Sequence, residues 1–537
     1  MRSSSRTRRL TSYAASALLV LGGGLLAASP ATAVVTADPI GVDEGTTWLT
    51  SQLSRGILHN DQYDFDDYGL TADAALALDA VGGHGATVSQ IANAIEAGAH
   101  DSWYTSTFKG TTTTYAGSVA KLLVLVQAAG GTPTSYGGHD LLALLNGLTA
   151  TTPPVAGRIE DTNNDFGDAN TVGQAFAVHG LATAGSAKAA AARGFLLKQQ
   201  CSAGFFRLTF ASRTATDQTC DGDASSAPDT DATAVALLQL EALQSSDSSV
   251  VNAIAQGRSW LRSTQKPDGS WGGGTNTEVA NANSTGLAAS ALGNSTEARQ
   301  AATWLRDHQV TGLDACNALA GQQGAIAYDD AGRSAGRRDG ITVTSTDQWR
   351  RATTQALPAL RWLPSVASAP LSLSGPAGYR KAGGRAQLDT DGAVAGTQLC
   401  LVGPGVRVRR TTSGGTWSNL VTLPAGTGRR TYTVHDAHGH ADSAVVRVLG
   451  RKTLDVSTSG TTVHRSDTIT AVVSGLAGGE HARVLYRGTV VASGDAGRRG
   501  RFVATIHVVR VLGDQTITGY GQFADIRRGS TVIKVVR

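Results

Sequence analysis

The chain has 537 residues, which predicts several domains at roughly 100–200 residues per domain. A hydrophobic content of 41% with 16% charged residues excludes a chain that is disordered as a whole. The net charge of +4 hides an asymmetry: residues 34–365 carry 20 Lys and Arg against 32 Asp and Glu, whereas residues 366–537 carry 22 against 10. The acidic larger part argues against a nucleic-acid-binding protein, and the charge break predicts two parts that face different surroundings.

The first 33 residues have the pattern of a secretory signal peptide. A basic stretch over Arg2–Arg9 precedes an apolar stretch over Ala14–Leu26, and Ala31-Thr32-Ala33 forms an A-x-A cleavage site. No later apolar run approaches the roughly 18–20 residues that span a bilayer, so we expect no transmembrane segment after cleavage. The pattern predicts a protein that is secreted or held at the cell wall, with export by the Sec or the twin-arginine route left open.

Export makes disulfide bonds possible for the four cysteines. Cys201 and Cys220 flank one loop, and we expect them to pair with each other. Cys316 and Cys400 either pair across domains or stay free. No C-x-x-C spacing occurs, so the sequence predicts neither a structural zinc site nor any cofactor.

Residues 34 to about 365 have the pattern of packed helices. They are rich in Ala and Leu, with apolar positions at three- and four-residue spacing, as in Ala234–Leu243. Six of the predicted helices are opened by small polar or acidic residues, and each follows another helix. The spacing predicts about six two-helix repeats, whose second helices begin near Leu70, Tyr115, Asp168, Asp229, Asn281 and Ser345.

Two of the preceding helices share a motif, an aromatic residue and Leu followed by Gln, Gly and a second aromatic residue at identical spacing. The copies are Phe195, Leu196, Gln200, Gly204 and Phe206, and Trp260, Leu261, Gln265, Gly269 and Trp271. This motif resembles the QW repeat of the squalene cyclase and protein prenyltransferase superfamily. The resemblance implies that residues 40–365 form an α/α toroid, an inner barrel of helices inside an outer ring. It says little about activity, because the same fold serves cyclases, prenyl transferases, cobalamin carriers and thioester domains.

After a linker at residues 362–370, the hydrophobic period changes from helical spacing to two. Segments such as 444–448 and 502–506 alternate in polarity, and glycine-rich turns separate them. We expect two immunoglobulin-like β-sandwiches, at residues 370–450 and 451–537. The predicted fold class is therefore multidomain, an all-α toroid followed by two all-β domains.

Two acidic segments resemble the D-x-D-D motif of class II terpene cyclases, which protonate an alkene with a carboxylic acid. Asp64-Phe65-Asp66-Asp67 matches it but lies in the first repeat, whereas Asp229-Thr230-Asp231 is better placed and has Ala232 at the last position. The favoured alternative is that Asp67 and Asp231 only cap helix N-termini. The zinc ligands of prenyl transferases and the thioester motif are both missing from the sequence.

A histidine-rich segment in the predicted β region offers a second possible chemistry. His435, Asp436, His438 and His440 lie close enough in sequence to ligate a metal. The same residues fit a polar hairpin turn between two strands, and this interpretation is favoured.

In a toroid the inner helices all start at one end, so the residues that open them surround one mouth. An apolar funnel with a few convergent polar groups is a typical binding site. We expect ligand-binding residues at Asp67, Tyr68, Tyr115, Asp168, Asn170, Gln174, Asp231, Asn283 and Asp347.

The leading hypothesis is a secreted, envelope-associated binding protein without catalytic activity. Its toroid would hold a small molecule or glycan, and its basic tail would contact anionic cell-wall polymer. The alternative is an enzyme, either terpenoid cyclase-like or a glycan lyase or hydrolase, that uses rim carboxylates such as Asp231 and Asp67. A spacer without a small ligand is a third possibility.

Overall fold

The computed structural model describes residues 37–98, 100–163, 169–366 and 370–537. The expected signal peptide at residues 1–33 and the expected rim residue Asp168 lie outside these ranges. Among the described residues, all helices lie before residue 363, and all strands except two short pairs lie after residue 371. The change from helix to strand falls where the hydrophobic period changes in the sequence.

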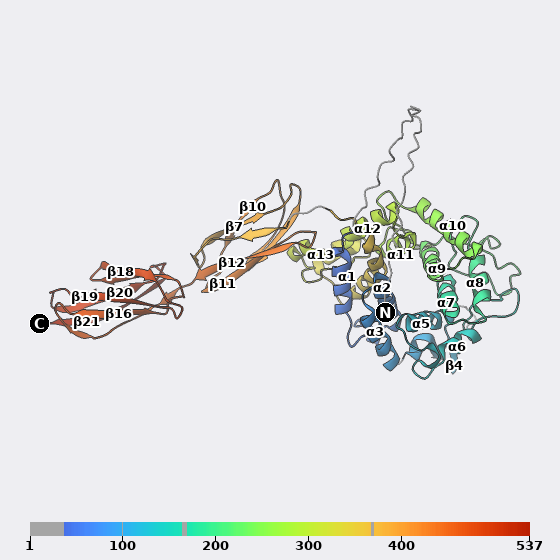
Figure 1. Ribbon diagram of the computed structural model, residues 1–537, viewed down its shortest axis with the longest axis horizontal. Coiled ribbons are helices and arrows are strands. Elements are labelled where there is room, and N and C mark those ends of the chain that lie inside the picture. The colour runs from blue at the N-terminus through green and yellow to red at the C-terminus, as the bar shows by residue number, and fades with distance from the viewer. Residues whose placement is uncertain (1–36, 99, 164–168, 367–369) are drawn as a thin grey trace, which may run out of the picture. The chain divides into compact units, whose positions relative to one another are not determined.

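Six helices form a closed inner ring. Each contacts the next in the series, and the last contacts the first; Figure 1 shows α5, α7, α9 and α11 on the inside of the ring. Each begins where small polar or acidic residues open a predicted helix. The six are α2 (Tyr68–Val81), α5 (Ala116–Ala128), α7 (Thr171–Thr183), α9 (Thr230–Ala242), α11 (Ala282–Leu292) and α14 (Thr346–Ala356).

A second set of helices surrounds this ring, and each of its members contacts an inner helix. The outer helices are α1 (Ile40–Ser51), α3 (Gly85–Ala97), α6 (Leu141–Gly147), α8 (Ala189–Lys198), α10 (Ser248–Thr264) and α12 (Thr296–His308). Shorter elements connect them: α4 (Asp101–Tyr104), α13 (Asp330–Asp339), the 3-10 helices η1 (Pro133–Ser135), η2 (Gly312–Cys316) and η3 (Leu357–Trp362), and the strand pairs β1 (His59–Asn60) with β2 (Phe65–Asp66) and β3 (Thr105–Phe108) with β4 (Thr111–Thr114).

Small residues allow the inner helices to approach closely. A Cβ atom on Gly173 of α7 would lie 2.8 Å from the Cα of Gly117 on α5. A Cβ atom on Gly286 of α11 would lie 2.4 Å from the Cα of Ala356 on α14. Because real Cβ atoms do not come so close to backbone, these seams require glycine.

The Gln and Gly of the repeated motif tie neighbouring outer helices together. Gln265 Nε2 donates to the carbonyl oxygens of Gly269 at 2.9 Å and of Glu297, in the first turn of α12, at 3.0 Å. Gly269 has a φ of +92°, a conformation that favours glycine. The same pair of bonds recurs twice, from Gln200 to Gly204 and Ala253 and from Gln309 to Gly324 and Gly41. The spacing in the sequence therefore reflects one helix end binding the start of the next outer helix.

Residues 372–449 form two sheets around one apolar core that includes Leu388, Leu401, Tyr432 and Val446. The strand order is β10-β7-β5 in one sheet and β6-β12-β11-β8-β9 in the other. Their bounds are β5 (Ser372–Ser374), β6 (Tyr379–Lys381), β7 (Arg385–Asp391), β8 (Gln398–Gly403), β9 (Val406–Thr411), β10 (Trp417–Thr422), β11 (Gly428–His435) and β12 (Ala441–Leu449).

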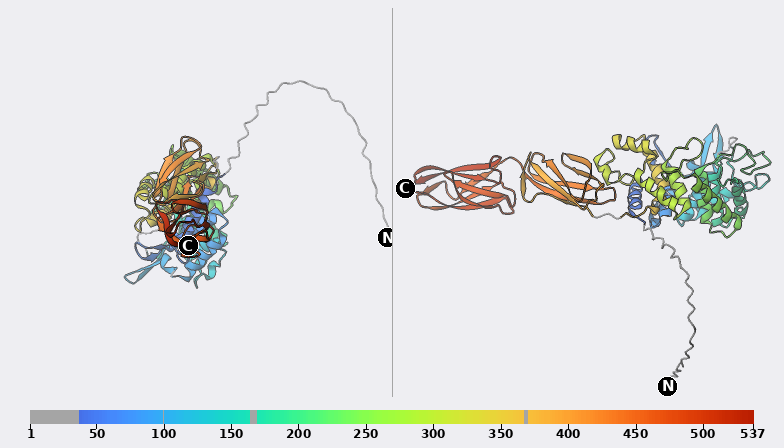
Figure 2. Two further views of the ribbon diagram at one scale, coloured as in Figure 1. Left: turned by 90° about the vertical axis from the view of Figure 1, so that its left-hand side faces the viewer. Right: turned by 90° about the horizontal axis from the view of Figure 1, so that it is seen from above.

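Residues 452–536 form a second pair of sheets, with a core that includes Val473, Val484, Ile506 and Ile533. Figure 2 shows the strands of each β domain. One sheet has the order β13-β21-β20-β17-β18, with β15 also paired to β21, and the other has β14-β16-β19. The bounds are β13 (Lys452–Thr453), β14 (Asp455–Thr458), β15 (Thr462–His464), β16 (Thr468–Ser474), β17 (His481–Tyr486), β18 (Thr489–Asp495), β19 (Arg501–His507), β20 (Gly513–Tyr520) and β21 (Arg527–Val536).

All four cysteines are in disulfide bonds. Cys201 bonds Cys220, which confirms the predicted pairing. Cys316 of η2 bonds Cys400 of β8, so the two cysteines whose state was left open link the helical part to the first β domain. Within the described ranges, none of the helices combines the length and the apolarity that a membrane crossing requires.

Candidate functional site

The inner ring encloses a cavity of about 520 Å³ that all six of its helices line. The lining residues recur at helical spacing, so that each helix presents one face to the cavity. On α9 this face carries Val235, Leu238 and Ala242, and on α7 it carries Phe176 and His179. Most of the surface is apolar, which makes this cavity the principal candidate for a ligand site.

A few polar pairs interrupt the apolar lining. Lys121 Nζ lies 2.7 Å from Asp73 Oδ1 and 5.7 Å from the centre of the Phe176 ring. His179 Nδ1 and Gln239 Oε1 are 2.6 Å apart. These bonds join neighbouring inner helices at matching heights, because the six helices run parallel. The polar groups are thus already partnered in the middle of the cavity.

A smaller pocket of about 230 Å³ lies at the N-terminal ends of α5 and α7. Two of the predicted rim residues, Tyr115 and Asn170, line it. Lys121, Val172 and Phe176 line this pocket and the central cavity alike, so these residues form a wall common to both. The rim and the central cavity therefore meet at these three residues.

Several predicted rim residues hold the ends of inner helices. Asp67 accepts from Leu70 N at 2.8 Å, which confirms that it caps α2. Arg351 of α14 lies 2.7 Å from Asp67 and 2.8 Å from Asp347, and it brings these two predicted residues together. The carboxylates of Asp67 and Asp347 therefore share one cation at the seam that closes the ring.

The other predicted rim residues are more dispersed. Asn170 caps α7 by accepting from Gly173 N. Tyr68 is buried against Gly98. Tyr115 Oη lies 2.8 Å from Ser106 Oγ on strand β3.

Gln174 is fully buried and serves the fold. Its Oε1 accepts from Ile159 N at 2.9 Å, and its Nε2 donates to the carbonyl oxygens of Gly157 and Ala192. Gly157 has a φ of +90° and packs against α8, as the glycines of the repeated motif pack against the next outer helix. Gln174 thus makes, from an inner helix, the bonds that the motif glutamines make elsewhere.

Asp231 does not cap its helix. Asp229 does so, accepting from Ala232 N at 2.7 Å, and the interpretation of Asp231 as a cap is wrong. Burial raises the pKa of Asp231 to about 6, against the lowering effect of the Ser284 hydroxyl. Its Oδ1 is buried without a hydrogen-bond partner, and so is Asn283 Oδ1 at the start of α11. Asp231 is therefore a buried acid on the helix face that continues into the cavity through Val235.

The raised pKa of Asp231 leads us to expect that the stability of the protein depends on pH. Because the pKa is raised in the folded protein, Asp231 stabilises the fold fully below its unfolded value of 3.8, and this contribution is lost as pH rises through about 6. We expect Asp231→Asn to leave stability near pH 4 almost unchanged and to raise it at pH 7 by up to about 3 kcal/mol. Urea denaturation of variant and parent at both pH values measures the difference. An identical pH dependence in the two proteins would contradict the assignment.

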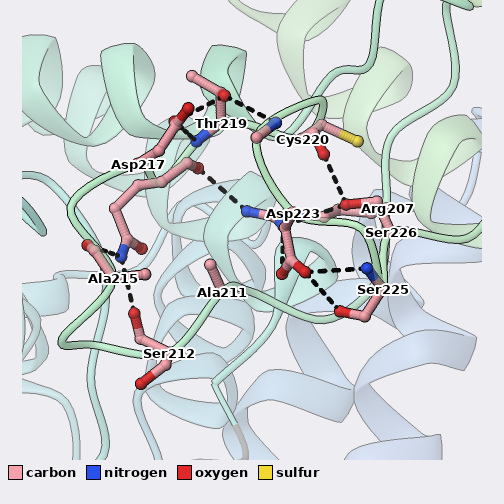
Figure 3. A network of polar contacts seen from close by, with 12 residues as sticks. Arg207, Ala211, Ser212, Ala215, Asp217, Thr219, Cys220, Asp223, Ser225 and Ser226 are labelled. Carbon is pink, nitrogen blue, oxygen red and sulfur yellow. Dashed lines mark hydrogen bonds and ion pairs between the residues drawn. The ribbon is translucent and has the colours of Figure 1, made fainter.

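A polar network connects the loop closed by Cys201 and Cys220 to the segment that follows it, and it surrounds a buried arginine (Figure 3). Arg207 is 1% exposed; its Nε donates to Gln199 Oε1, and its Nη1 lies 3.0 Å from Asp223 Oδ2. A hydrogen bond from Ser225 lowers the pKa of Asp223. The Arg207 cation and the Asp223 carboxylate thus form an ion pair, which ties the disulfide loop to the segment after Cys220.

The histidine-rich segment is a hairpin turn organised by a buried carboxylate. Asp436 accepts from the backbone N of His438 and of His440, and it lies 2.8 Å from His440 Nδ1. Among the residues that the structure describes, no group of three or more His, Cys, Asp or Glu could hold a metal ion.

The cavity residues were largely missed by sequence reasoning, which stopped at the first turn of each inner helix. Leu287 and Ser290 lie four and seven residues after Asn283 and share its helix face. The same spacing leads from Asp231 to Val235 and Leu238. Counting four and seven residues onward from each rim residue would have identified the cavity-lining residues from the sequence.

No protein-family model and no curated protein matches this chain. Among solved structures, the type II terpene cyclase MstE from Scytonema is similar at 14% identity and a TM-score of 0.40, covering 60% of this chain and 96% of its own. A protein from Actinoplanes is similar at 15% identity and a TM-score of 0.41, covering 60% and 98%. The human OSCAR ligand-binding domain is similar to 31% of this chain at 12% identity and a TM-score of 0.23, with all of its own length covered. Similarities of this degree establish neither an activity nor a ligand.

Proposed function

We propose that the helical ring is a non-catalytic binding protein for a small, mainly apolar molecule. The observation that carries the proposal is the cavity of about 520 Å³ inside the ring, within the range of about 300–1,000 Å³ typical of small-molecule sites. Val235, Leu238 and Leu287 give it an apolar surface. This lining favours an apolar molecule over a glycan, because glycan hydroxyls would be buried there without partners.

Direct binding of a naphthalene probe tests this proposal. The full chain is expected to bind 2-methylnaphthalene with a stoichiometry of one, measured by equilibrium dialysis. Val235→Trp places an indole in the cavity and should weaken binding at least tenfold. Val251→Trp, at an exposed position of the outer helix α10, should leave it unchanged. Absence of binding by the parent, or equal loss in both variants, would overturn the proposal.

A second candidate is acid-initiated cyclisation of an isoprenoid, with Asp231 as the proton donor. The observation that favours it is the buried carboxyl with a pKa of about 6 and an unpartnered Oδ1. Asp231→Asn is expected to stabilise the fold at pH 7, so any loss of turnover in this variant cannot be attributed to unfolding. Conversion of squalene by the parent and not by the variant would support this candidate over simple binding.

For the C-terminal β domains we propose contact with anionic cell-wall polymer outside the cell. The proposal is supported by the excess of 22 basic over 10 acidic residues in 366–537 and by the two disulfide bonds. Because salt screens exposed charges, protein bound to isolated wall at about 0.05 M salt should be released at about 1 M. Retention at high salt would show that the contact is not electrostatic.

A further inference from the structure

One end of the central cavity gathers buried polar atoms that have no hydrogen-bond partner. Two are amide oxygens, Gln127 Oε1 and Gln355 Oε1, and two are hydroxyls, Ser290 Oγ and Thr354 Oγ1. The fifth is a cationic donor, Arg361 Nε. All five residues line the cavity.

These residues lie together because the inner helices end at the same level. Gln127 occupies the last turn of α5, and Ser290 occupies the last turn of α11. Gln355 closes α14, and η3, which carries Arg361, follows directly. Gln127 Nε2 donates to Gly180 O near the end of α7, and Arg361 Nη1 donates to Ala80 O near the end of α2. These bonds hold the side chains of Gln127 and Arg361 in place, while Gln127 Oε1 and Arg361 Nε have no partner.

Unpartnered buried polar atoms are rare in folded proteins, because each has lost its hydrogen bonds to water. Ser290 and Thr354 are 7% and 2% exposed, so bulk solvent does not reach them. In the middle of the cavity Lys121 is partnered by Asp73 and His179 by Gln239. The exposed carboxylate of Asp79, in the last turn of α2, lines the same end as the five atoms. A concentration of unpartnered atoms at one end of an otherwise apolar cavity points to a polar group of a ligand at that end.

The chemistry of the five atoms restricts this polar group. The two amide oxygens only accept hydrogen bonds, Arg361 Nε only donates, and the two hydroxyls do either. A carboxylate would leave both amide oxygens without a donor, and it would face the partial negative charge at the helix C-termini. A quaternary ammonium group has no donor and would meet the Arg361 cation.

We infer that this end of the cavity binds the uncharged hydroxyl of an otherwise apolar molecule. The hydroxyl donates to an amide oxygen and accepts from Arg361 or a hydroxyl, and the apolar body extends toward Val235 and Leu287. The inference rests on the proposed binding function and names its ligand class, an apolar alcohol or phenol.

Three probes with one apolar body test the inference by equilibrium dialysis against the full chain at pH 7. We expect 2-naphthol to bind at least tenfold more tightly than 2-methylnaphthalene and than 2-naphthoate. In the Thr354→Val, Gln355→Leu double variant this preference should fall to below threefold. Thr303→Val, on the outer helix α12, serves as the matched control and should retain the preference.

Both substitutions remove unpartnered buried atoms, so the double variant is expected to remain folded and at least as stable as the parent. Equal affinity of the parent for 2-naphthol and 2-methylnaphthalene would overturn the inference and leave the proposed function intact, as would an unchanged preference in the double variant. Tighter binding of 2-naphthoate would overturn it in favour of an anionic ligand. No binding of any probe would instead overturn the proposed function itself.

Discussion

The Gly324→Ala variant is expected to lose about 4 kcal/mol of stability in the helical part. Gly324 has a φ of +98°, in which a side chain is strained, and a Cβ atom there would lie 2.0 Å from the carbonyl oxygen of Glu44 in α1. The clash is with backbone, so no rotamer change relieves it. The carbonyl oxygen of Gly324 accepts a hydrogen bond from Gln309 Nε2. Gln309 follows α12 and also binds α1, so this contact closes the outer ring.

Gly321→Ala is the matched control for this prediction. Gly321 lies in the same loop with a φ of +85°, but a Cβ atom there would meet nothing within 4 Å. Gly321→Ala should therefore lose only about 1 kcal/mol of stability, from backbone strain alone. Urea denaturation followed by far-UV circular dichroism measures both variants. Equal losses would show that the contact with Glu44 contributes nothing.

The parts of the fold that could be predicted from the sequence are those set by local rules. The six inner helices begin at residues such as Asn281 and Asp229, whose side chains accept hydrogen bonds from the first turn. Cys201 and Cys220 pair across one loop, as their spacing suggested. The repeated Gln and Gly marked a repeat, but the carbonyl groups that Gln265 binds are set by the packing of the next helix.

The candidate site depended on contacts that are remote in sequence. Asp229 and Asp231 both fit the spacing of a helix cap, and only the path of the chain before α9 decides that Asp229 takes this role. The prediction also concentrated on the end where the inner helices begin. The five unpartnered atoms of the cavity-lining residues lie at the opposite end, where Ser290 and Thr354 look like ordinary polar residues of a helix until burial is known.

In the second β domain, Glu480→Gln is expected to cost about 3–5 kcal/mol, because it leaves a buried charge without its partner. Arg527 and Glu480 are 1% and 0% exposed, and Arg527 Nε and Nη2 lie 2.6 and 2.8 Å from the two carboxylate oxygens. Arg527 also donates to the carbonyl oxygens of Gly450 and Gly475. Arg527 therefore joins the start of β21 to the residue after β12 and to the residue after β16.

Hydrogen exchange of peptides from β17 and β21, followed by mass spectrometry at increasing urea, measures the loss in the full chain. Asp495→Asn is the control, since it removes the exposed pair of Asp495 with His481 in the same sheet and should change exchange little. The Glu480→Leu, Arg527→Met double variant should recover most of the stability, because replacing both partners removes the uncompensated charge. If the double variant were as unstable as Glu480→Gln, the loss would come from the hydrogen bonds that the Glu480 carboxylate accepts from Ala477 N and Gln522 N rather than from the unpaired charge.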